Sequence, residues 1–566
     1  MRILPASAFV CCLALAAGCQ RKVEAPPPPP IVVAQIHFVG SGQLAGNTNA
    51  LKLKSLWAMP TTIALREQTL GRLAGAAEAW LRSTPDAAPA TNAPALVTNA
   101  VTNAVAGASN AVPAAISPVR PLLDDLLSAE SFVAARRQTN GAEDLTLAVR
   151  LPLERAAMWR SNLLALLAPG ATNQTNSTVT ELADGWQIKR AKAPESWRLA
   201  VAGDWVLLGC GHDQLPTFDA ALQRAKTNAP PFEATGDSWL DGELEWPRVM
   251  RDVPPLAGWP VTRGHFSLRG KGENLRFEAR FEPTPDSLGA LDDWKIPASL
   301  IREDTARDQI ISFTAARGLA PWLGRNFWFK PSDGLAAPNE LFVWAQTHVP
   351  YQTRIAFPVA SATGTVAQIA ARFGSGGVTN VPLLSRAQLE IQTNNMVMAW
   401  TGLPIIVPYL SAKTVPEGEF ILGGLFPVDV SSNAPPADLF AQVTGRTNLV
   451  YYDWEITQNR VLQWYTLFQL GSIIGAVPQT GGYSAAQRWV AAVAPKLGNT
   501  VTEITATGTN QLSLLRVSHT GFTGIELATL AYWLDDPAFP AFHLAEEPPG
   551  PRLPRMRAPA KAPPKP

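Results

Sequence analysis

Cys210 and His212 are the residues whose types and spacing most directly suggest catalysis. A thiol close to an imidazole is the arrangement of a nucleophile and its base. The pair lies in Gly-Cys-Gly-His-Asp, where the pattern also predicts the end of a strand, a glycine turn and a helix capped by Asp213. We therefore interpret the stretch as a strand-to-helix turn and predict no catalytic residue. We also predict no metal site, because the other histidines are scattered singly. They are His37, His265, His348, His519 and His543.

Residues 40–45 (GSGQLA) fit the glycine-rich pattern G-x-G-x-x-A of dinucleotide-binding loops. Such a loop opens a helix and is followed by an acidic residue on a second parallel strand. No helix is predicted at Gly40 and no acidic residue stands at the expected distance, so we interpret the stretch as a flexible turn. The sequence also contains no H-E-x-x-H, G-x-S-x-G, S-x-x-K or Walker lysine motif. We therefore expect no cofactor.

Adjacent carboxylates occur at residues 124–125, 292–293 and 535–536. A general acid and a general base must both face the bond that they cleave. Neighbouring side chains on a helix or strand point away from each other, so these pairs are poorly placed to cooperate. We expect them to cap helices or to face solvent.

Tryptophan is the most unusual component of the sequence, with 18 copies. Several lie in segments rich in proline and glycine, where exposed indoles can form a stacking platform for a glycan. The alternative is that these indoles fill gaps between irregular loops and the sheets. The candidate ligand-binding residues are Trp239, Trp246, Trp259, Trp322 and Trp328.

The composition is that of a folded protein without a strong electrostatic field. Apolar residues make up 46% of the 566 residues, charged residues make up 16%, and the net charge is +1. Soluble domains typically carry about 25% charged residues. A nearly neutral chain has no global field to attract nucleic acid, so we expect no nucleic-acid partner. The choice of partner must then depend on local surface.

The N-terminal residues have the pattern of an export signal. Arg2 precedes an apolar run, residues 3–17, that is too short to span a bilayer as a helix. Residues 15–19 read Leu-Ala-Ala-Gly-Cys, an order that resembles the lipobox in the signal peptides of bacterial lipoproteins. The resemblance covers residues 1–19 only. It implies that residues 1–18 are removed and that Cys19 is acylated, which anchors the chain in a membrane. An ordinary secretory signal cleaved nearby is the alternative, and it also exports the chain.

The same resemblance predicts a location. Gln20, rather than aspartate, follows Cys19, which in lipoprotein sorting favours the outer membrane over the inner one. In a two-membrane cell the protein would then face the periplasm or the cell surface. Cys210 is the one cysteine left unmodified after residue 18, so we expect no intrachain disulfide. The prolines at 26–30 predict a polyproline II spacer of about 15 Å.

Most predicted strands pair as hairpins around turns that contain Asn, Gly or Asp. Tight turns make consecutive strands antiparallel, and the strands never alternate regularly with helices. The predicted fold class is therefore α+β, with antiparallel hairpin-built sheets and packed helices. The hairpins are expected at residues 132–151, 197–208, 265–281, 387–400 and 501–517.

Two stretches share an order of elements that suggests an internal repeat. Residues 149–153 (VRLPL) and 355–359 (IAFPV) each place a strand before a proline and a helix after it, and a hairpin follows. We therefore predict two diverged strand–helix–hairpin units. Further helices are expected near residues 61–80, 121–127, 461–477 and 484–498, and the third of these is predicted to be a buried helix and not a membrane span.

Composition divides the chain into seven segments. Residues 84–118 are almost entirely Ala, Asn, Thr, Val and Pro, which cannot bury enough apolar surface to fold. The segments are a signal peptide (1–18), a lipid anchor and Pro-rich spacer (19–30), an N-terminal strand and helix expected to pack on the first unit (31–83), a low-complexity linker (84–118), a first α+β unit (119–300), a second α+β unit (301–547) and a Pro-rich basic tail (548–566).

Together these features favour a non-catalytic envelope lipoprotein that acts as a binding or assembly module for a protein or lipid partner. One alternative is a glycan-binding or cell-wall-associated protein that uses the tryptophans. The other is a hydrolase with a dispersed active site, because catalytic groups can converge from distant positions.

Overall fold

The structure is a computed structural model, and its described residues cover most of the two predicted units. The predicted signal peptide, Cys19, the spacer, most of the linker and the basic tail lie outside them. The described residues are 31–82, 117–137, 143–168, 177–190, 195–212, 214–233, 237–249, 261–284, 310–320, 337–346, 353–374, 387–392, 396–403, 406–415, 418–426, 442–443, 446, 448–474, 484–508, 510–536 and 539–540.

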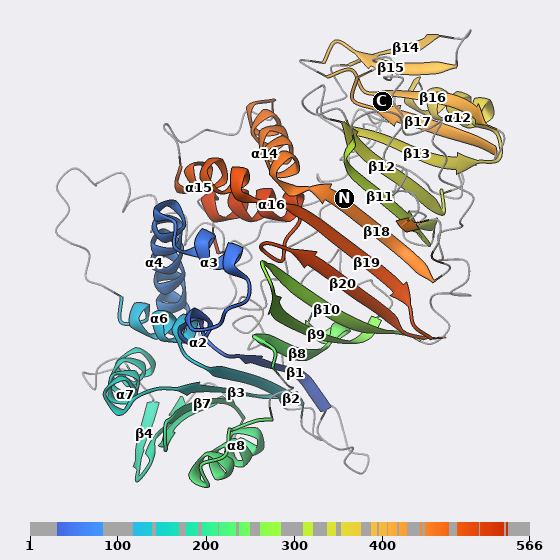
Figure 1. Ribbon diagram of the computed structural model, residues 1–566. Coiled ribbons are helices and arrows are strands. Elements are labelled where there is room, and N and C mark those ends of the chain that lie inside the picture. The colour runs from blue at the N-terminus through green and yellow to red at the C-terminus, as the bar shows by residue number, and fades with distance from the viewer. Residues whose placement is uncertain are drawn as a thin grey trace, which may run out of the picture.

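The strands of the described residues form one twenty-stranded sheet (Figure 1). The strands of the first half are β1 (Ile31–Phe38), β2 (Ser131–Arg137), β3 (Glu143–Arg150), β4 (Ser177–Leu182), β5 (Gly185–Arg190), β6 (Ser196–Ala202), β7 (Trp205–Gly211), β8 (Leu240–Glu245), β9 (Val261–Lys271) and β10 (Asn274–Pro283). The strands of the second half are β11 (Ile310–Arg317), β12 (Glu340–Gln346), β13 (Thr353–Val359), β14 (Gln388–Gln392), β15 (Val397–Thr401), β16 (Tyr409–Val415), β17 (Gly418–Gly424), β18 (Leu449–Ile456), β19 (Asn499–Ala506) and β20 (Leu512–Ser518).

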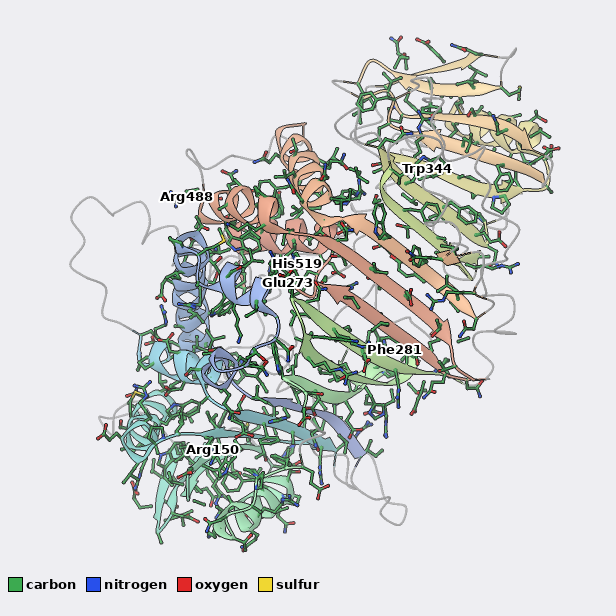
Figure 2. The ribbon with its side chains drawn as sticks, viewed as in Figure 1. Arg150, Glu273, Phe281, Trp344, Arg488 and His519 are labelled. Atoms are coloured by element: carbon green, nitrogen blue, oxygen red, sulfur yellow. The ribbon has the colours of Figure 1, made fainter. Side chains whose placement is uncertain are left out.

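The two halves of the sheet follow the same strand order from their outer edges inward. The first reads β4-β5-β6-β7-β3-β2-β1-β8-β9-β10. The second reads β14-β15-β16-β17-β13-β12-β11-β18-β19-β20, so adding ten to each number of the first order gives the second. The halves meet where β10 pairs with β20. Phe281 on β10 and Trp344 on β12 mark the two halves in Figure 2.

Local hairpins supply much of this sheet, and every strand pairing among the described residues is antiparallel. The five predicted hairpins are confirmed as the pairs β2–β3, β6–β7, β9–β10, β14–β15 and β19–β20. Gly203, in the turn between β6 and β7, has a φ of 58°, a conformation that glycine adopts without strain. Together with the helices, this confirms the predicted α+β class.

A layer of helices covers one face of the central strands (Figure 1). Its longest member, α4, contacts helices of both halves of the chain and so ties them together. No helix in the described ranges is long and apolar enough to cross a membrane. The helices of this layer are α2 (Ser41–Ala45), α3 (Leu51–Trp57), α4 (Pro60–Arg82), α6 (Arg120–Ser128), α14 (Thr457–Ile474), α15 (Ala485–Val493) and α16 (Gly524–Asp535).

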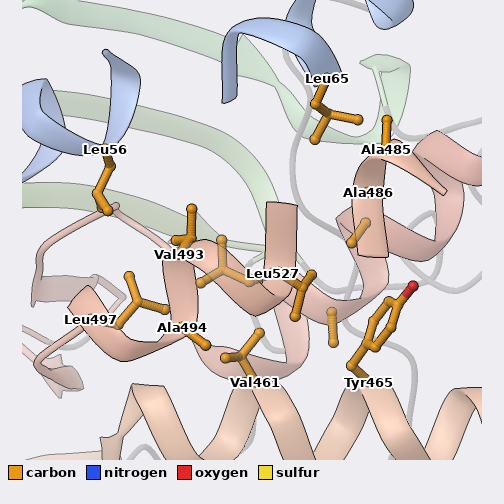
Figure 3. Packing of buried hydrophobic residues seen from close by; sticks show 13 residues of the cluster. Leu56, Leu65, Val461, Tyr465, Ala485, Ala486, Val493, Ala494, Leu497 and Leu527 are labelled. Carbon is orange, nitrogen blue, oxygen red and sulfur yellow. The ribbon is translucent and has the colours of Figure 1, made fainter. Parts of the chain in front are cut away.

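The core of the helical layer joins segments that are far apart in the sequence. Leu56 of α3 and Leu65 of α4 belong to the same buried cluster as Val461 and Tyr465 of α14 and Leu527 of α16 (Figure 3). Burying a side chain of this size contributes about 1.5–3 kcal/mol. The N-terminal helices are therefore stabilised by C-terminal helices as well as by the first unit.

The outer strands of the first half are covered on both faces by helices α7 (Leu153–Leu167) and α8 (Pro216–Lys226). Trp159 of α7 packs with Val149 of β3 in one cluster, whereas Phe218 of α8 packs with Ala148 in another. Successive strand residues point to opposite faces, so α7 and α8 lie on opposite sides of β3. In the second half, α12 (Ala362–Gly374) covers Phe357 of β13 and its neighbours.

Two predicted helix starts differ from the structure, and one helix was not predicted. Pro60, rather than Thr61 or Thr62, begins α4, and proline suits a first helical turn because its missing N–H is not needed there. A short helix, α2, begins at Ser41, where we expected only a turn. α8 begins at Pro216 with Leu215 as its N-cap, so the expected cap by Asp213, which lies outside the described residues, is wrong. Asp144 on β3 accepts hydrogen bonds from the backbone N–H and the hydroxyl of Thr217, at 2.8 and 2.7 Å.

Candidate functional site

The first of two buried charge clusters surrounds His37 on β1, and we call it the histidine clamp. Nδ1 of His37 lies 3.2 Å from Oδ2 of Asp241 on β8, and Nε2 lies 3.3 Å from Oε1 of Glu130, which directly precedes β2. The imidazole stacks on Phe132, with ring centroids 4.3 Å apart. The sheet register brings these groups together, because His37 stands opposite Asp241 on one neighbouring strand and opposite Phe132 on the other.

The two carboxylates decide the charge of His37. Burial lowers the pKa of His37, but the hydrogen bonds and charges of Glu130 and Asp241 outweigh burial and raise it above its ordinary value of 6.5. The hydrogen bond to His37 is in turn the main reason why the pKa of Glu130 is lowered. Imidazolium and carboxylates therefore stabilise one another across three separate segments of the chain.

The geometry of the clamp favours a structural role over a catalytic one. A histidine that acts as a general base needs one ring nitrogen within reach of the reacting group. Both nitrogens of His37 face carboxylates, and the residue is buried. While the clamp holds, His37 has no nitrogen left to accept a proton from a substrate.

The second cluster lies between the sheet and the helices α14 and α16, and we call it the carboxylate cluster. Asp453 and Glu455 alternate on β18, which directs both towards the helical layer. The hydroxyl of Thr314 on β11 donates to Oδ1 of Asp453 at 2.6 Å. The backbone N–H of Gly524, the first residue of α16, donates to Oε1 of Glu455 at 2.6 Å. Both carboxyl groups are buried.

Two arginines and a third carboxylate complete the carboxylate cluster. Nη1 of Arg516 on β20 donates to Oε2 of Glu526 on α16 at 2.7 Å. The same Glu526 oxygen accepts the backbone N–H of Thr523 at 2.8 Å, as part of the capping box that begins α16. Arg460 on α14 is attracted to the charges of Glu455 and Asp453. The sheet is thus joined to the two helices by five ionisable residues, Asp453, Glu455, Arg460, Arg516 and Glu526.

Burial sets the protonation of this cluster. It raises the pKa of Glu455 to about 8, with the nearby charge of Asp453 as a further cause, so Glu455 carries a proton at neutral pH. Burial also raises the pKa of Asp453 and lowers that of Arg460. Glu455 therefore adds no full negative charge beside Asp453 at neutral pH.

The carboxylate cluster can exchange a proton, but its oxygens serve internal contacts. Oxygens of all three carboxyl groups accept hydrogen bonds from Thr314, Gly524 or Arg516. Within the described ranges, no group of three or more His, Cys, Asp and Glu side chains is arranged to hold a metal ion. The arrangement is that of a charged tie between helices and sheet.

The tryptophans proposed as a glycan platform are not gathered on one surface in the part of the chain that the structure describes. Trp239 is 6% exposed and lies in a buried cluster with Ala50 and Leu275. Trp246 is half-buried and makes an edge contact with the Phe281 ring, at 5.8 Å between centroids. Stacking on a sugar requires an open indole face, which Trp239 does not offer. The remaining candidates, Trp259, Trp322 and Trp328, lie outside the described residues, as does Cys19.

Cys210 is buried on β7, opposite Leu145 on β3 and Trp197 on β6. His212 directly follows the end of that strand, and α8 begins a few residues later. The strand-to-helix turn that we expected is therefore confirmed. A thiol between two packed strands lacks the exposure that a nucleophile needs.

Two of the three adjacent carboxylate pairs, residues 124–125 and 535–536, lie in the described residues. Asp535 accepts a hydrogen bond from the hydroxyl of Ser484. Asp125 accepts hydrogen bonds from Arg155 and from the indole of Trp159, at 2.8 Å each for the shortest contacts. Asp124 instead faces Arg120. Asp125 is buried, so our prediction that these carboxylates cap helices or face solvent is wrong for this residue.

Sequence analysis did not single out any member of the clamp or of the carboxylate cluster for a function. A signal for the carboxylate cluster is present at residues 451–455 (YYDWE), where two acids alternate along an aromatic strand. Alternation places both acids on one face of the strand, so that face must accommodate charge. His37, a single histidine in an apolar strand, carries no comparable signal.

Comparison with protein-family models, curated proteins and solved structures finds no match to this chain.

Proposed function

We propose that this chain is a non-catalytic lipoprotein of a bacterial cell envelope that acts as a binding or assembly module for a protein or lipid partner. The observation that carries the proposal is the single twenty-stranded sheet with one strand order in both halves. Such a sheet is a broad scaffold with large faces. The use of both buried charge clusters as internal ties supports a scaffold more than an active site.

We also propose that the two halves are diverged copies of one unit. The shared strand order supports this, and so do the helices α7 and α12, each of which follows the third strand of its half. Proline stands near the end of that strand in both halves, as Pro152 and Pro358. Superposition tests the idea, because β1–β10 should then align with β11–β20 in the same register. A different strand order in either half would contradict it.

The proposed location of the protein is a membrane, to which acylated Cys19 would anchor it. The lipobox-like residues 15–19 and the Gln20 that follows support an outer-membrane position in a two-membrane cell. A diacyl or triacyl cysteine supplies the second chain that stable anchoring requires.

Replacing Cys19 with serine tests the anchor. The Cys19→Ser protein should appear in the soluble fraction of lysed cells, whereas the parent should sediment with membranes. Cys210→Ser is the matched control and should sediment like the parent, because Cys210 is buried in the first half. Continued sedimentation of a processed Cys19→Ser protein would place the anchor elsewhere.

Crosslinking in cells tests the binding role. The protein should be purified from membranes with its crosslinked partners, which mass spectrometry then identifies. A reproducible protein or lipid partner that is lost when the crosslinker is omitted supports a binding module. Recovery of the chain alone at several crosslinker lengths would contradict the assembly role.

A further inference from the structure

The first part of the helical layer exposes three large apolar side chains within thirteen residues. Large hydrophobic residues that are well exposed in the described residues include Leu51 at 55%, Trp57 at 39% and Ile63 at 40%, all within a short stretch of α3 and α4. The other faces of these helices are committed to the core, because Leu56 and Leu65 are buried. The exposed set is therefore a surface feature and not an imperfectly packed core.

Basic side chains lie on the same helices as this apolar surface and on the neighbouring segment that contains α15. The guanidinium of Arg66 lies over the Trp57 ring at 5.3 Å. Lys52 lies on α3 itself, as does Lys54, whose ammonium also donates to the backbone carbonyl of Asn47. Leu56 shares its cluster with Val493 and Leu497, which brings α15 and the turn after it beside α3 (Figure 3). That segment adds Arg488, labelled in Figure 2, and Lys496.

Acidic groups only partly offset this charge. Glu273 lies 4.0 Å from Lys52, and Glu67 lies 4.0 Å from Arg66. Exposed pairs of this kind are weak and are screened by salt, so they leave the basic side chains able to meet other anions. Basic residues that flank Trp, Leu and Ile side chains are typical of protein surfaces that lie in the interface of an anionic bilayer.

The length of chain before β1 allows this surface to reach the membrane that holds Cys19. β1 has eight residues, which span about 26 Å, and α2 and α3 follow its far end. Residues 19–30 in an extended conformation span about 37 Å. The tether is thus long enough for Cys19 and α3 to meet the same bilayer.

We propose that Leu51, Trp57 and Ile63, with the basic residues around them, form a membrane-seating surface that inserts into the headgroup region of an anionic bilayer. This inference rests on the proposed function, because the lipid at Cys19 would bring the surface to the membrane. The surface then fixes the orientation of the long sheet relative to the bilayer, which a flexible tether alone cannot do.

Vesicle sedimentation of the chain from residue 19 onward, with Cys19→Ser, tests the surface without the anchor and without the apolar run of residues 3–17. This protein should bind vesicles of phosphatidylglycerol and phosphatidylethanolamine, and it should bind phosphatidylcholine vesicles far less. Binding should weaken as salt is added, because the basic side chains are exposed. Absence of binding to the anionic vesicles would overturn the proposal.

Substitutions within the surface locate the binding. Adding Trp57→Ala and Ile63→Ala to the Cys19→Ser chain should weaken vesicle binding at least tenfold, on the order expected for two inserted apolar side chains. Leu51→Ser is a second variant at a more exposed position, and it should weaken binding without a risk to folding. Leu153→Ala is the matched control, because Leu153 is 80% exposed on α7, and it should leave binding unchanged. Equal binding by all these variants would overturn the proposal.

Acylation is measured separately, by incorporation of labelled palmitate into the chain with native Cys19. Vesicle binding without incorporated label would keep the membrane-seating surface and remove the proposed anchor. Incorporated label without vesicle binding by the Cys19→Ser chain would keep the anchor and remove the surface.

Discussion

The histidine clamp and the carboxylate cluster both tie distant segments together with buried charge, but they balance that charge differently. The clamp sets one imidazole between two carboxylates, which together favour the charged form of His37, and His37 in turn favours the charged form of Glu130. The carboxylate cluster crowds three acids near two arginines, and it keeps Glu455 protonated at neutral pH instead of pairing it. Pairing and neutralisation are two solutions to the cost of burying charge.

The two clusters also lie on opposite faces of the sheet. Directly opposed residues of neighbouring strands point to the same face of a sheet. Asp241 is opposite Ser267, Ser267 is opposite Glu278, and Glu278 is opposite Leu515, so all four side chains point to one face. Arg516, the next residue along β20, points to the other face and contacts α16 there. Each face of the sheet therefore has its own charged tie, and substitutions can test them independently.

Arg516→Met should have the largest effect. Glu526 would lose its ion pair while remaining buried, and breaking a buried pair typically costs about 3–5 kcal/mol. Urea denaturation followed by tryptophan fluorescence measures the free energy of unfolding. Arg488→Met, at an exposed position on α15, is the control and should change little. A cost for Arg516→Met as small as that of the control would show that the carboxylate cluster does not hold α16.

His37→Phe should have the next largest effect. The ring can still stack on Phe132, but Asp241 and Glu130 would lose their shared partner, at a cost of about 1–3 kcal/mol. His265→Phe is the matched control, because His265 lies on β9 with its side chain 44% exposed. If the two substitutions destabilise equally, the clamp contributes nothing beyond an ordinary surface contact.

Glu455→Gln should change how stability depends on pH. The pKa of Glu455 is raised from 4.5 to about 8 on folding, so the wild type should lose stability as pH rises from 4.5 to about 8. The loss attributable to this group is at most about 1.4 kcal/mol per pH unit. The Gln variant should lack this slope, whereas Glu390→Gln, on the exposed strand β14, should keep it. If the Glu455→Gln variant keeps the slope, Glu455 is not protonated in the folded protein at neutral pH.

The clamp predicts a pH dependence with a maximum, because its contribution to stability falls on both the alkaline and the acid side. Because the pKa of His37 is raised, the clamp's contribution to the free energy of unfolding decreases as pH rises beyond 6.5. Because the pKa of Glu130 is lowered, the same contribution decreases as pH falls below 4.5. The stability difference between wild type and His37→Phe should therefore be greatest between these values. A difference that stays constant from pH 4 to 9 would contradict this.

Arg150→Ala should have the smallest effect. Arg150 lies 3.4 Å from Glu130 at the rim of the clamp, with its side chain 52% exposed. Exposed pairs contribute about 0–1 kcal/mol and are screened by salt. Denaturation with and without added salt measures the effect, and a loss comparable to that of His37→Phe would extend the clamp to include Arg150.

Sequence patterns predicted the local parts of the fold and missed how they join. The hairpin around Gly203 was predictable because its strands are adjacent in the chain and its turn residues are diagnostic. The β10–β20 pair was not, because no local signal states which distant strand an edge will meet. The carboxylate cluster was missed for the same reason: Asp453 and Arg516 approach each other only after β18, β19 and β20 have paired. For Trp239, composition suggested a binding role, and burial could be seen only in the folded structure.

The strand order has a consequence for the time at which the protein becomes complete. β10 ends at Pro283, but its neighbour β20 begins only at Leu512, close to the C-terminal end of the chain. A growing or translocating chain can therefore assemble the first half of the sheet while one edge of β10 is still without its partner strand β20. Unpaired strand edges are templates for aggregation, and non-local pairings form slowly. The β10–β20 pairing at the centre of the sheet is therefore the last to form. A chain truncated before residue 512 should expose the unpaired edge of β10 and aggregate.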